Sequence, residues 1–414
     1  MGRRRNSASK RRRPFHEARA KHPARMRARM ATGEVGVSGP LSESSRLRVF
    51  MTGDAVGGVW QYALDLAEGL RPHGVDVTLA VLGPAPSADQ QRMAEAAGID
   101  LMLTGLPLDW VADTPEDVEE AGRVLACIAT QVAPDIVHLN NPALAAHVAF
   151  PAPVVAVCHS CVATWWQAVR SGPLPEEFVW RTTLVREGYM SANVLLAPTA
   201  AFAQATAGYY DLGTPPIVVR NGRRAPSFQR RAAQDLFVFT AGRLWDDGKN
   251  VAALDRAAAC LTIPVRAAGP VEGPNGAFVR MRNIEPLGKL SDEEIGRCLA
   301  AKPIFVSSAR YEPFGLAVLE AAQAGCPLVL SDIPTFRELW DGAAVFVGPD
   351  DDEGLARAIH ALAQDADARA RLGKAAQAVA MTYSVEAMSA GVLKVYRSLL
   401  ARNVEKSSVE EAAA

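Results

Sequence analysis

The stretch Leu236-Phe-Val-Phe-Thr-Ala-Gly-Arg-Leu-Trp-Asp-Asp-Gly-Lys249 decides the fold of this chain. Its first residues form a short apolar run typical of a buried strand, and Gly242 then marks a turn. A helical pattern begins near Asn250. The same order of apolar run, turn and helical pattern occurs once before, from Arg46 onward. A chain of 414 residues that starts this unit twice is expected to form two domains.

The first unit reads Arg46-Leu-Arg-Val-Phe-Met-Thr, followed by Gly53-Asp-Ala-Val-Gly-Gly58. Apolar residues then recur at helical spacing from Trp60 to Leu70. Further strand–turn–helix units follow in both halves of the chain. Their apolar runs are 75–82, 136–139, 154–157 and 194–197 in the first half, and near 265, 304–306, 328–330 and 345–347 in the second. Strands that alternate with helices predict parallel sheets covered on both faces.

We therefore expect an α/β protein with two Rossmann-like, doubly wound domains that face each other across a cleft. In such sheets the ligand binds at the carboxyl ends of the strands. The expected organisation is a disordered basic tail (1–45), an N-terminal domain (46–222), a linker (223–235), a C-terminal domain (236–383), a C-terminal helix packing back towards the N-terminal domain (384–402) and a disordered tail (403–414).

The charge distribution is uneven. Residues 1–30 contain twelve Lys and Arg and a single acid, which leaves the remainder of the chain at −12 against an overall −1. An acidic body gives no general case for binding nucleic acid. The basic segment has three readings: a dispensable solvated tail, which we favour; an arm for nucleic acid or acidic lipid; or an upstream extension, with Met26 and Met30 as later starts.

No stretch approaches the roughly 18–20 apolar residues of a membrane span, and the first 30 residues lack the apolar run of a secretory signal. We expect a cytoplasmic protein and leave open peripheral contact with the inner membrane face.

Cys158-His-Ser-Cys161 has the spacing of a redox or metal motif, but no second cysteine pair completes a structural zinc site. Packing at a strand end is the favoured interpretation of both cysteines.

The run Arg310-Tyr-Glu-Pro-Phe-Gly-Leu-Ala-Val-Leu-Glu-Ala-Ala322 follows the predicted strand 304–306. Because proline favours the first helical position, we expect a helix to begin near Pro313, with Glu312 at its cap. Glu320 then lies roughly 12 Å further along the axis. That distance is too long for one acid–base pair and suits two ends of an extended ligand. A phosphate between them would meet the free N–H groups of Phe314, Gly315 and Leu316.

Both carboxylates also have a simpler interpretation: Glu312 caps the helix and Glu320 is a solvated side chain. Arg243 and Lys249 place two cations at the end of the second domain's first strand, where a diphosphate leaving group would gather charge. They too have an alternative as solvated charges. A lysine at a helix start is unfavourable for the helix dipole, however, and a bound anion explains it.

The loop that contains Gly57 and Gly58 is not G-x-G-x-x-G, and the second strand ends in Val81-Leu-Gly83 without an acid for a ribose. These features argue against a dinucleotide-dependent dehydrogenase. The glycines still leave a helix N-terminus open to an anion or a sugar.

Taken in order, these motifs resemble the family-4 retaining glycosyltransferases of the GT-B fold, also described as glycosyl transferases group 1. The resemblance covers about residues 46–400. It is strongest from Phe239 to Pro349, where A-G-R-L…K-N, G-K-L-S-D-E-E-I, Y-E-P-F-G-L-A-V-L-E-A and A-G-C-P-L-V-L-S-D-I-P follow one another.

The resemblance implies a role for each candidate site residue. Glu312, His159, Arg243 and Lys249 would act at the reacting centre, with Glu312 and His159 directed at the sugar. Glu320 would bind the ribose of the nucleotide. The remaining donor-binding residues would be Gly57, Gly58, Asn221 (in the interdomain Asn221-Gly222 turn), Phe314, Gly315 and Leu316.

The implied reaction is transfer of a sugar from a nucleoside-diphosphate donor with retention at the anomeric carbon. The co-substrate would be a UDP- or GDP-linked sugar rather than an ADP-linked one, with no other cofactor and no metal. The acceptor would be a carbohydrate, a lipid-linked molecule or a small molecule. We expect it on the first domain, against Trp60, Trp165 and Trp166, although core packing explains the last two equally well. The alternatives are a GT-B epimerase or phosphorylase, or a non-catalytic nucleotide-sugar-binding protein.

Overall fold

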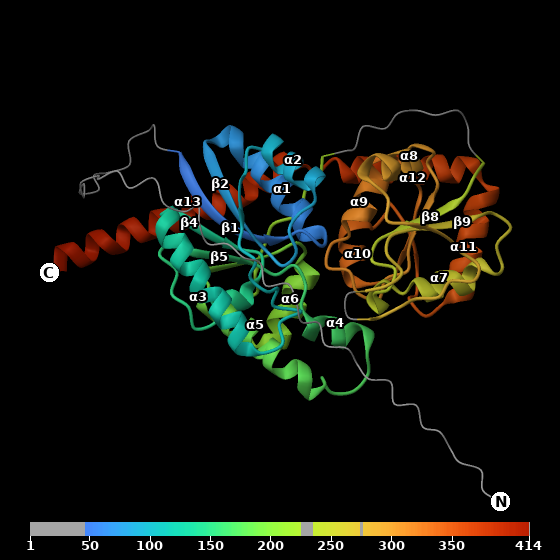
Figure 1. Cartoon of the computed structure of the whole chain (residues 1–414). Coiled ribbons are helices and arrows are strands. Elements are labelled where there is room, and N and C mark those ends of the chain that lie inside the picture. Colours follow the sequence, from blue (N-terminus) through green and yellow to red (C-terminus); the bar gives the residue numbers. More distant parts are fainter. Residues whose placement is uncertain (1–45, 225–234, 274–275, 414) are drawn as a thin grey trace, which may run out of the picture. The chain divides into compact units, whose positions relative to one another are not determined.

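The computed structural model describes residues 46–224, 235–273 and 276–413. The expected basic tail 1–45 and most of the expected linker 223–235 lie outside these residues. The described chain contains two parallel sheets of seven and six strands (Figure 1). The prediction of two Rossmann-like α/β domains is confirmed.

The first sheet has the strand order β3-β2-β1-β4-β5-β6-β7, with every neighbouring pair parallel. Its strands are β1 (Leu47–Asp54), β2 (Val75–Leu82), β3 (Asp100–Leu103), β4 (Ile136–Leu139), β5 (Val154–Val157), β6 (Val194–Ala197) and β7 (Ile217–Val218). The helices of this half are α1 (Gly58–Leu70), α2 (Ala88–Ala96), α3 (Pro115–Val132), α4 (Val162–Val169), α5 (Glu176–Ser191) and α6 (Ala200–Tyr210), with 3-10 turns η1 (Arg71–His73) and η2 (Pro142–Ala145).

The second sheet has the order β10-β9-β8-β11-β12-β13 and is also parallel. Its strands are β8 (Val238–Ala241), β9 (Val265–Ala268), β10 (Glu285–Gly288), β11 (Ile304–Ser307), β12 (Leu328–Ser331) and β13 (Val345–Val347). The helices are the 3-10 turn η3 (Asp247–Lys249), α7 (Val251–Ala258), α8 (Asp292–Ala300), α9 (Leu316–Gln323), α10 (Pro334–Trp340), α11 (Asp352–Gln364), α12 (Ala366–Ala380) and α13 (Val385–Ala413).

Each sheet is buried on both faces, because successive strand residues point in opposite directions. In β1, Val49 and Met51 pack into the core beneath α1 and α13, whereas Phe50 packs with residues of α3 and α5. In β8, Phe239 packs with α9, α10 and α12, and Val238 packs with α7 and α11. The continuous apolar runs of the sequence therefore correspond to strands covered on two sides.

The last helix, α13, belongs to the core of the first domain. Met388, Val392 and Leu399 are buried there among residues of α1 and β1. Tyr396 is fully buried as well, and its hydroxyl lies 2.7 Å from Nδ1 of His138 in β4. A side chain near the C-terminus thereby bonds to a central strand of the first sheet.

Three expected helix limits differ from the structure. The helix expected near Pro313 begins at Leu316, because Gly315 adopts the left-handed conformation (φ +92°) as its N-cap and stops the helix there. The segment 353–380, where the sequence shows a helical pattern throughout, forms two helices, since the Asp365 carboxylate caps α12 through Ala368 N (2.8 Å). Helix α13 continues past residue 402 to Ala413. Residues 403–413 contain no Gly or Pro and several good helix formers, which explains the extension.

Candidate active site

Asp246 organises the cationic loop that follows β8. Its carboxylate accepts hydrogen bonds from Arg243 Nη2 (2.9 Å), from Gly248 N (2.8 Å) and from Trp165 Nε1 (3.0 Å). Burial raises the pKa of Asp246, but nearby Arg243 and Lys249 outweigh that effect and the pKa lies below its usual value. An ionised Asp246 therefore fixes the turn from which both cations project. Sequence reasoning missed Asp246, although its place between Arg243 and Lys249 was a usable signal.

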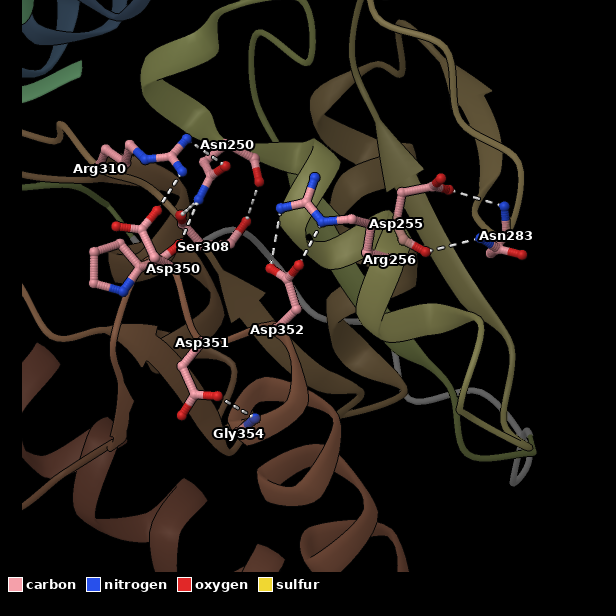
Figure 2. Close-up of polar contacts among 11 residues, drawn as sticks. Asn250, Asp255, Arg256, Asn283, Ser308, Arg310, Asp350, Asp351, Asp352 and Gly354 are labelled. Carbon is pink, nitrogen blue, oxygen red and sulfur yellow. Dashed lines mark hydrogen bonds and ion pairs between the residues drawn. The ribbon is translucent and has the colours of Figure 1, made fainter. Parts of the chain in front are cut away.

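Asn250 holds the far end of the same loop. Its backbone is left-handed (φ 51°), and its Nδ2 donates to Ser308 O (3.0 Å) and Pro349 O (2.9 Å). Arg310 Nη1 donates to Asn250 Oδ1 (2.8 Å), and Ser308 Oγ donates to Asn250 O (2.9 Å). Figure 2 shows these contacts joining the turn to the ends of β11 and β13. Lys249, the preceding residue, thus projects from a fixed backbone.

Lys249 forms an ion pair with Glu312, with 2.5 Å between Nζ and Oε2. Both side chains are largely buried, at 21% and 17% exposed. Two predicted residues that are 63 positions apart in sequence are therefore in direct contact. The expectation that Glu312 caps the following helix is wrong, because α9 starts four residues later at Leu316.

The N-terminus of α9 lies beside this pair. The first bond of the helix runs from Leu319 N to Gly315 O (3.1 Å), which leaves the N–H groups of its first turn, from Leu316 on, directed outward. The amides of Phe314 and Gly315 precede the helix, so of the three predicted amides only that of Leu316 belongs to its first turn. A side-chain carbon on Gly315 would lie 3.2 Å from Glu312 Cγ, so this glycine also keeps the glutamate close.

The loop of the first domain that contains Gly57 and Gly58 lies beside Arg243 and the start of α9. Gly57 is the N-cap of α1 and has no side-chain cap. A side-chain carbon at Gly57 would lie 3.9 Å from Arg243 Nη1, and one at Gly58 would lie 3.6 Å from Leu316 Cδ1. Burial raises the pKa of the neighbouring Asp54, and the positive charge of Arg243 opposes that rise. Asp54 is a second residue that sequence reasoning missed.

Glu320 is not a free carboxylate. It pairs with Arg223 Nε, and Arg223 Nη1 lies 3.3 Å from Asp65 Oδ2 in α1. Arg223 is only 9% exposed. Burial raises the pKa of Glu320, and Arg223 works against that rise. Arg223 lies in the expected linker (223–235), and no pattern in the sequence identifies it as the partner of Glu320.

The Asn221-Gly222 turn is clamped between two segments. Asn221 is 8% exposed. A side-chain carbon on Gly222 would lie only 2.0 Å from Ser384 O, so the turn requires glycine at this position. Gly222 N donates to Met388 Sδ (3.2 Å), and Arg223 N donates to Tyr383 O (3.2 Å). The turn therefore lies against the segment that enters α13.

His159 follows β5 and belongs to a different network. Its Nε2 lies 2.7 Å from Asn140 Oδ1, and its ring packs edge-on against Tyr62 at 4.6 Å between centroids. Burial lowers the pKa of His159 to about 4. No contact found among the described residues joins His159 to Arg243 or Lys249. The structure therefore brings together Gly57, Gly58, Arg243, Lys249, Glu312 and Leu316, joins Glu320 through Arg223, and holds His159 separately.

The tryptophans and cysteines have structural partners. Trp60 is 4% exposed and packs in the first domain's core, so the expectation that it meets an acceptor is wrong. Trp166 Nε1 donates to Gly172 O (3.2 Å).

Cys158 is buried, and burial raises the pKa of its thiol to about 12. Cys161 caps α4, with its sulfur accepting from Thr164 N (3.4 Å). Within the described residues, no group of three or more His, Cys, Asp or Glu side chains is placed to hold a metal ion.

Two family models match the chain, each on one domain. The Glycosyltransferase Family 4 model matches residues 56–223, and the Glycosyl transferases group 1 model matches residues 281–379. The first match covers strands β2 to β7, and the second covers β10 to β13 together with Glu312 and Glu320; Arg243 and Lys249 lie between the two matches. The chain belongs to the family 4 and group 1 glycosyltransferases. No helix in the described part of this glycosyltransferase is long and apolar enough to cross a membrane.

Known relatives agree with this assignment. The glycosyltransferase is 27% identical to a glycogen synthase of Mycobacterium tuberculosis over 389 residues, covering 82% of this chain and 91% of the relative. It is 39% identical over 79 residues to a GDP-mannose:cellobiosyl-diphosphopolyprenol alpha-mannosyltransferase of Xanthomonas oryzae pv. oryzae, covering 19% and 21%.

Solved structures share the fold at low identity. Sucrose-phosphate synthase from Thermosynechococcus elongatus superimposes with a TM-score of 0.72 at 16% identity, covering 86% of this chain and all of the other. A glycosyltransferase from Rickettsia africae gives 0.65 at 16% identity, covering 86% and 99%. The GT-B fold expected from the motifs is thereby confirmed.

Proposed function

We propose that this glycosyltransferase moves a sugar from a nucleoside-diphosphate donor to a carbohydrate or lipid-linked hydroxyl with retention at the anomeric carbon. The observation that carries the proposal is the convergence of Arg243, Lys249 and the N-terminus of α9. Two cations and a helix N-terminus within one site suit a diphosphate that gains charge as it leaves. Each cation also has a carboxylate partner, which keeps it in place before the donor binds.

The proposed reaction breaks the bond between the anomeric carbon and the terminal phosphate oxygen. The acceptor oxygen forms the new bond on the same face of the sugar, and its proton passes to the departing phosphate. Arg243, Lys249 and the amides of α9 stabilise the charge on that phosphate. In this account Glu312 contacts the sugar, Glu320 contacts the ribose, and the protein acts by positioning and charge stabilisation.

The proposed donor is UDP- or GDP-linked. Support for a GDP-linked donor comes from the Xanthomonas relative, whose name states GDP-mannose as a substrate. A panel of UDP-, GDP- and ADP-linked sugars in a thermal-shift assay tests the donor, since a ligand at a hundred times its Kd stabilises the folded state by about 2.7 kcal/mol. We expect a UDP- or GDP-sugar to raise the melting temperature. A panel in which no nucleotide sugar raises it would contradict the proposal.

The same donors then separate transfer from the alternative activities. An epimerase or phosphorylase does not release nucleoside diphosphate in proportion to an added acceptor, and a non-catalytic binding protein releases none. We expect release to depend on the acceptor, with the product linkage in the same anomeric configuration as the donor. A product of inverted configuration, read from its NMR coupling constants, would overturn retention.

Replacing Trp165 by phenylalanine is expected to weaken donor binding several-fold. The change removes the Trp165 Nε1 bond to Asp246 while Arg243 and Gly248 keep theirs. One hydrogen bond to a charged group contributes about 1.5–3 kcal/mol at most. The effect on donor binding is expected to be smaller, because Arg243 and Gly248 still donate to Asp246. The measurement is the donor KM in the transfer assay. Trp166→Phe is the matched control, because Trp166 bonds to Gly172 instead; an equal KM in both variants would exclude this role for Trp165.

A further inference from the structure

Three strands of the first sheet bring Thr52, Asn140 and His159 together. Thr52 lies in β1, Asn140 directly follows β4, and His159 follows β5. These strands are neighbours in the sheet order β1-β4-β5, so their carboxyl ends share one edge. Thr52 and Asn140 are buried, whereas His159 is partly exposed. This is the edge at which ligands bind in open parallel sheets.

The contacts of Asn140 fix the orientation of its side-chain amide. One end lies 2.7 Å from the backbone oxygen of Thr52, and that oxygen can only accept a hydrogen bond. The group facing it must therefore be the NH₂, which leaves Oδ1 at the other end. The backbone of Asn140 is held as well, since its N–H donates to Thr52 Oγ1 (3.1 Å). Asn140 thus presents an acceptor to His159 in a fixed position.

The hydrogen-bond acceptor Oδ1 of Asn140 fixes the tautomer of the His159 imidazole. Because Oδ1 of Asn140 lies 2.7 Å from His159 Nε2, Nε2 must carry the hydrogen. A neutral ring that carries its hydrogen on Nε2 has a lone pair on Nδ1. Among the described residues, no hydrogen bond to His159 Nδ1 is found. Nδ1 is therefore an unused hydrogen-bond acceptor on a partly exposed ring.

The surroundings keep the ring neutral. The titratable groups that face it are Tyr62 from α1 and His138 from β4, and Cys158 and Cys161 flank it in the chain. Burial raises the pKa of Tyr62, raises that of Cys158 to about 12, and lowers that of His138 to about 3. These three groups are uncharged at neutral pH, and burial alone lowers the pKa of His159 to about 4. The ring therefore stays neutral at neutral pH and keeps the lone pair on Nδ1.

We propose that Asn140 is a positioning residue that holds His159 as the Nε2–H tautomer, so that Nδ1 accepts a hydrogen bond from a hydroxyl of a bound sugar. The proposal rests on the proposed transferase function and deepens it. His159 then contributes to specificity by recognising a hydroxyl, rather than by removing a proton or by offering a positive charge. The sugar is either the transferred unit or the acceptor, and the experiment distinguishes them.

The first measurement needs no activity. In protein labelled with ¹⁵N-histidine, NMR at pH 7 is expected to show His159 as the neutral tautomer with hydrogen on Nε2, assigned by comparison with His159→Gln. Imidazolium, or the tautomer with hydrogen on Nδ1, would overturn the assignment. If this tautomer is found in a protein that turns over no nucleotide sugar, the proposed function fails while the tautomer assignment stands.

The second measurement uses Asn140→Asp and the pH profile of transfer. A carboxylate opposite Nε2–H favours imidazolium, in which both nitrogens carry hydrogen and Nδ1 cannot accept. We expect the rate of Asn140→Asp at pH 6 to be about ten-fold or more below wild type and to recover as the pH rises. A pH profile parallel to that of the wild type would overturn the role of Asn140. A fall in donor affinity without acceptor identifies the hydroxyl as the donor's, whereas a rise in acceptor KM alone identifies the acceptor's.

Two variants of His159 test the proposal independently of Asn140→Asp, because that variant also loses the bond to Thr52 O. In His159→Asn the amide oxygen can occupy the place of Nδ1 and accept, whereas in His159→Gln the amide replaces Nε2 and leaves no acceptor near Nδ1. We expect His159→Asn to retain about ten-fold more activity than His159→Gln, with equal melting temperatures. The reverse order would show that Nε2 is the functional nitrogen and overturn the proposal.

Discussion

Replacing Lys249 by methionine is expected to lower the turnover number by about 10²- to 10³-fold, the loss typical of removing one charge-stabilising group from a transition state. Lys249 Nζ lies at the ion pair with Glu312, beside the N-terminus of α9. Methionine keeps much of the apolar stem but removes the charge that would stabilise the departing phosphate. The effect should appear in kcat more than in donor KM, because the phosphate gains charge in the transition state.

Two controls separate this effect from the loss of the ion pair. Lysine-to-methionine substitution at Lys374, which is exposed on α12, should leave the rate unchanged. The double variant Lys249→Met with Glu312→Gln removes the unpaired carboxylate, and we expect it to stay as inactive as Lys249→Met. Recovery of activity in the double variant would mean that the buried charge of Glu312, rather than the missing lysine, caused the loss.

Replacing Arg223 by methionine is expected to reduce both donor affinity and stability. The change leaves the carboxylates of Asp65 and Glu320 without their shared partner, and removing one member of a buried ion pair costs about 3–5 kcal/mol. Burial already raises the pKa of both carboxyls against the opposition of Arg223. Without that opposition we expect both pKa values to rise further and Glu320 to become protonated more readily. A protonated Glu320 would bind a ribose diol less well.

The pH dependence of the Arg223→Met stability follows from these directions. A carboxyl whose pKa is higher in the folded than in the unfolded protein destabilises the folded state when it is ionised. This destabilisation grows as the pH rises above the unfolded-state pKa and is complete above the folded-state pKa. The stability deficit against wild type should therefore be largest near neutral pH and shrink as the pH falls. Urea unfolding from pH 5 to 8 measures it. Arg223→Lys should recover part of the loss, and Arg224→Met, at a 63% exposed neighbour, should show little. A deficit that grows as the pH falls would contradict this account.

Much of the fold could be predicted from the sequence because the strands are short, continuous apolar runs that end in turns. The run beginning at Leu236 and the earlier run beginning at Leu47 both became central strands. The limits of α9 could not be predicted, because Pro313 indicated a start that the left-handed Gly315 overrides. The strand β3 (Asp100–Leu103) was missed because only four residues at a sheet edge, none of them fully buried, carry the signal.

The sequence indicates the cations and carboxylates of the candidate site but not the residues that hold them in place. Arg243, Lys249 and Glu312 stand in motifs that the sequence displays, and the structure brings Lys249 and Glu312 into contact. Arg223 and Asn140 act through contacts that join distant segments, and sequence spacing does not report such contacts. Asp246 differs, because its contacts with Arg243 and Gly248 are local and its place between the two cations was a usable signal. The Arg223 pair with Glu320 spans 97 positions. Which carboxylate an arginine meets at that separation is decided by the fold.

The central claim is that Arg243 and Lys249 form the diphosphate site, and direct titration of nucleoside diphosphate tests it most simply. Calorimetry with UDP and with GDP, without sugar or acceptor, is carried out on wild type, on the double variant Arg243→Met with Lys249→Met, and on Trp166→Phe. The account predicts that wild type binds UDP or GDP and that Trp166→Phe binds the same nucleotide with the same affinity. The double variant is expected to bind that nucleotide about a hundred-fold or more weakly. Wild-type affinity in a folded double variant would contradict the claim.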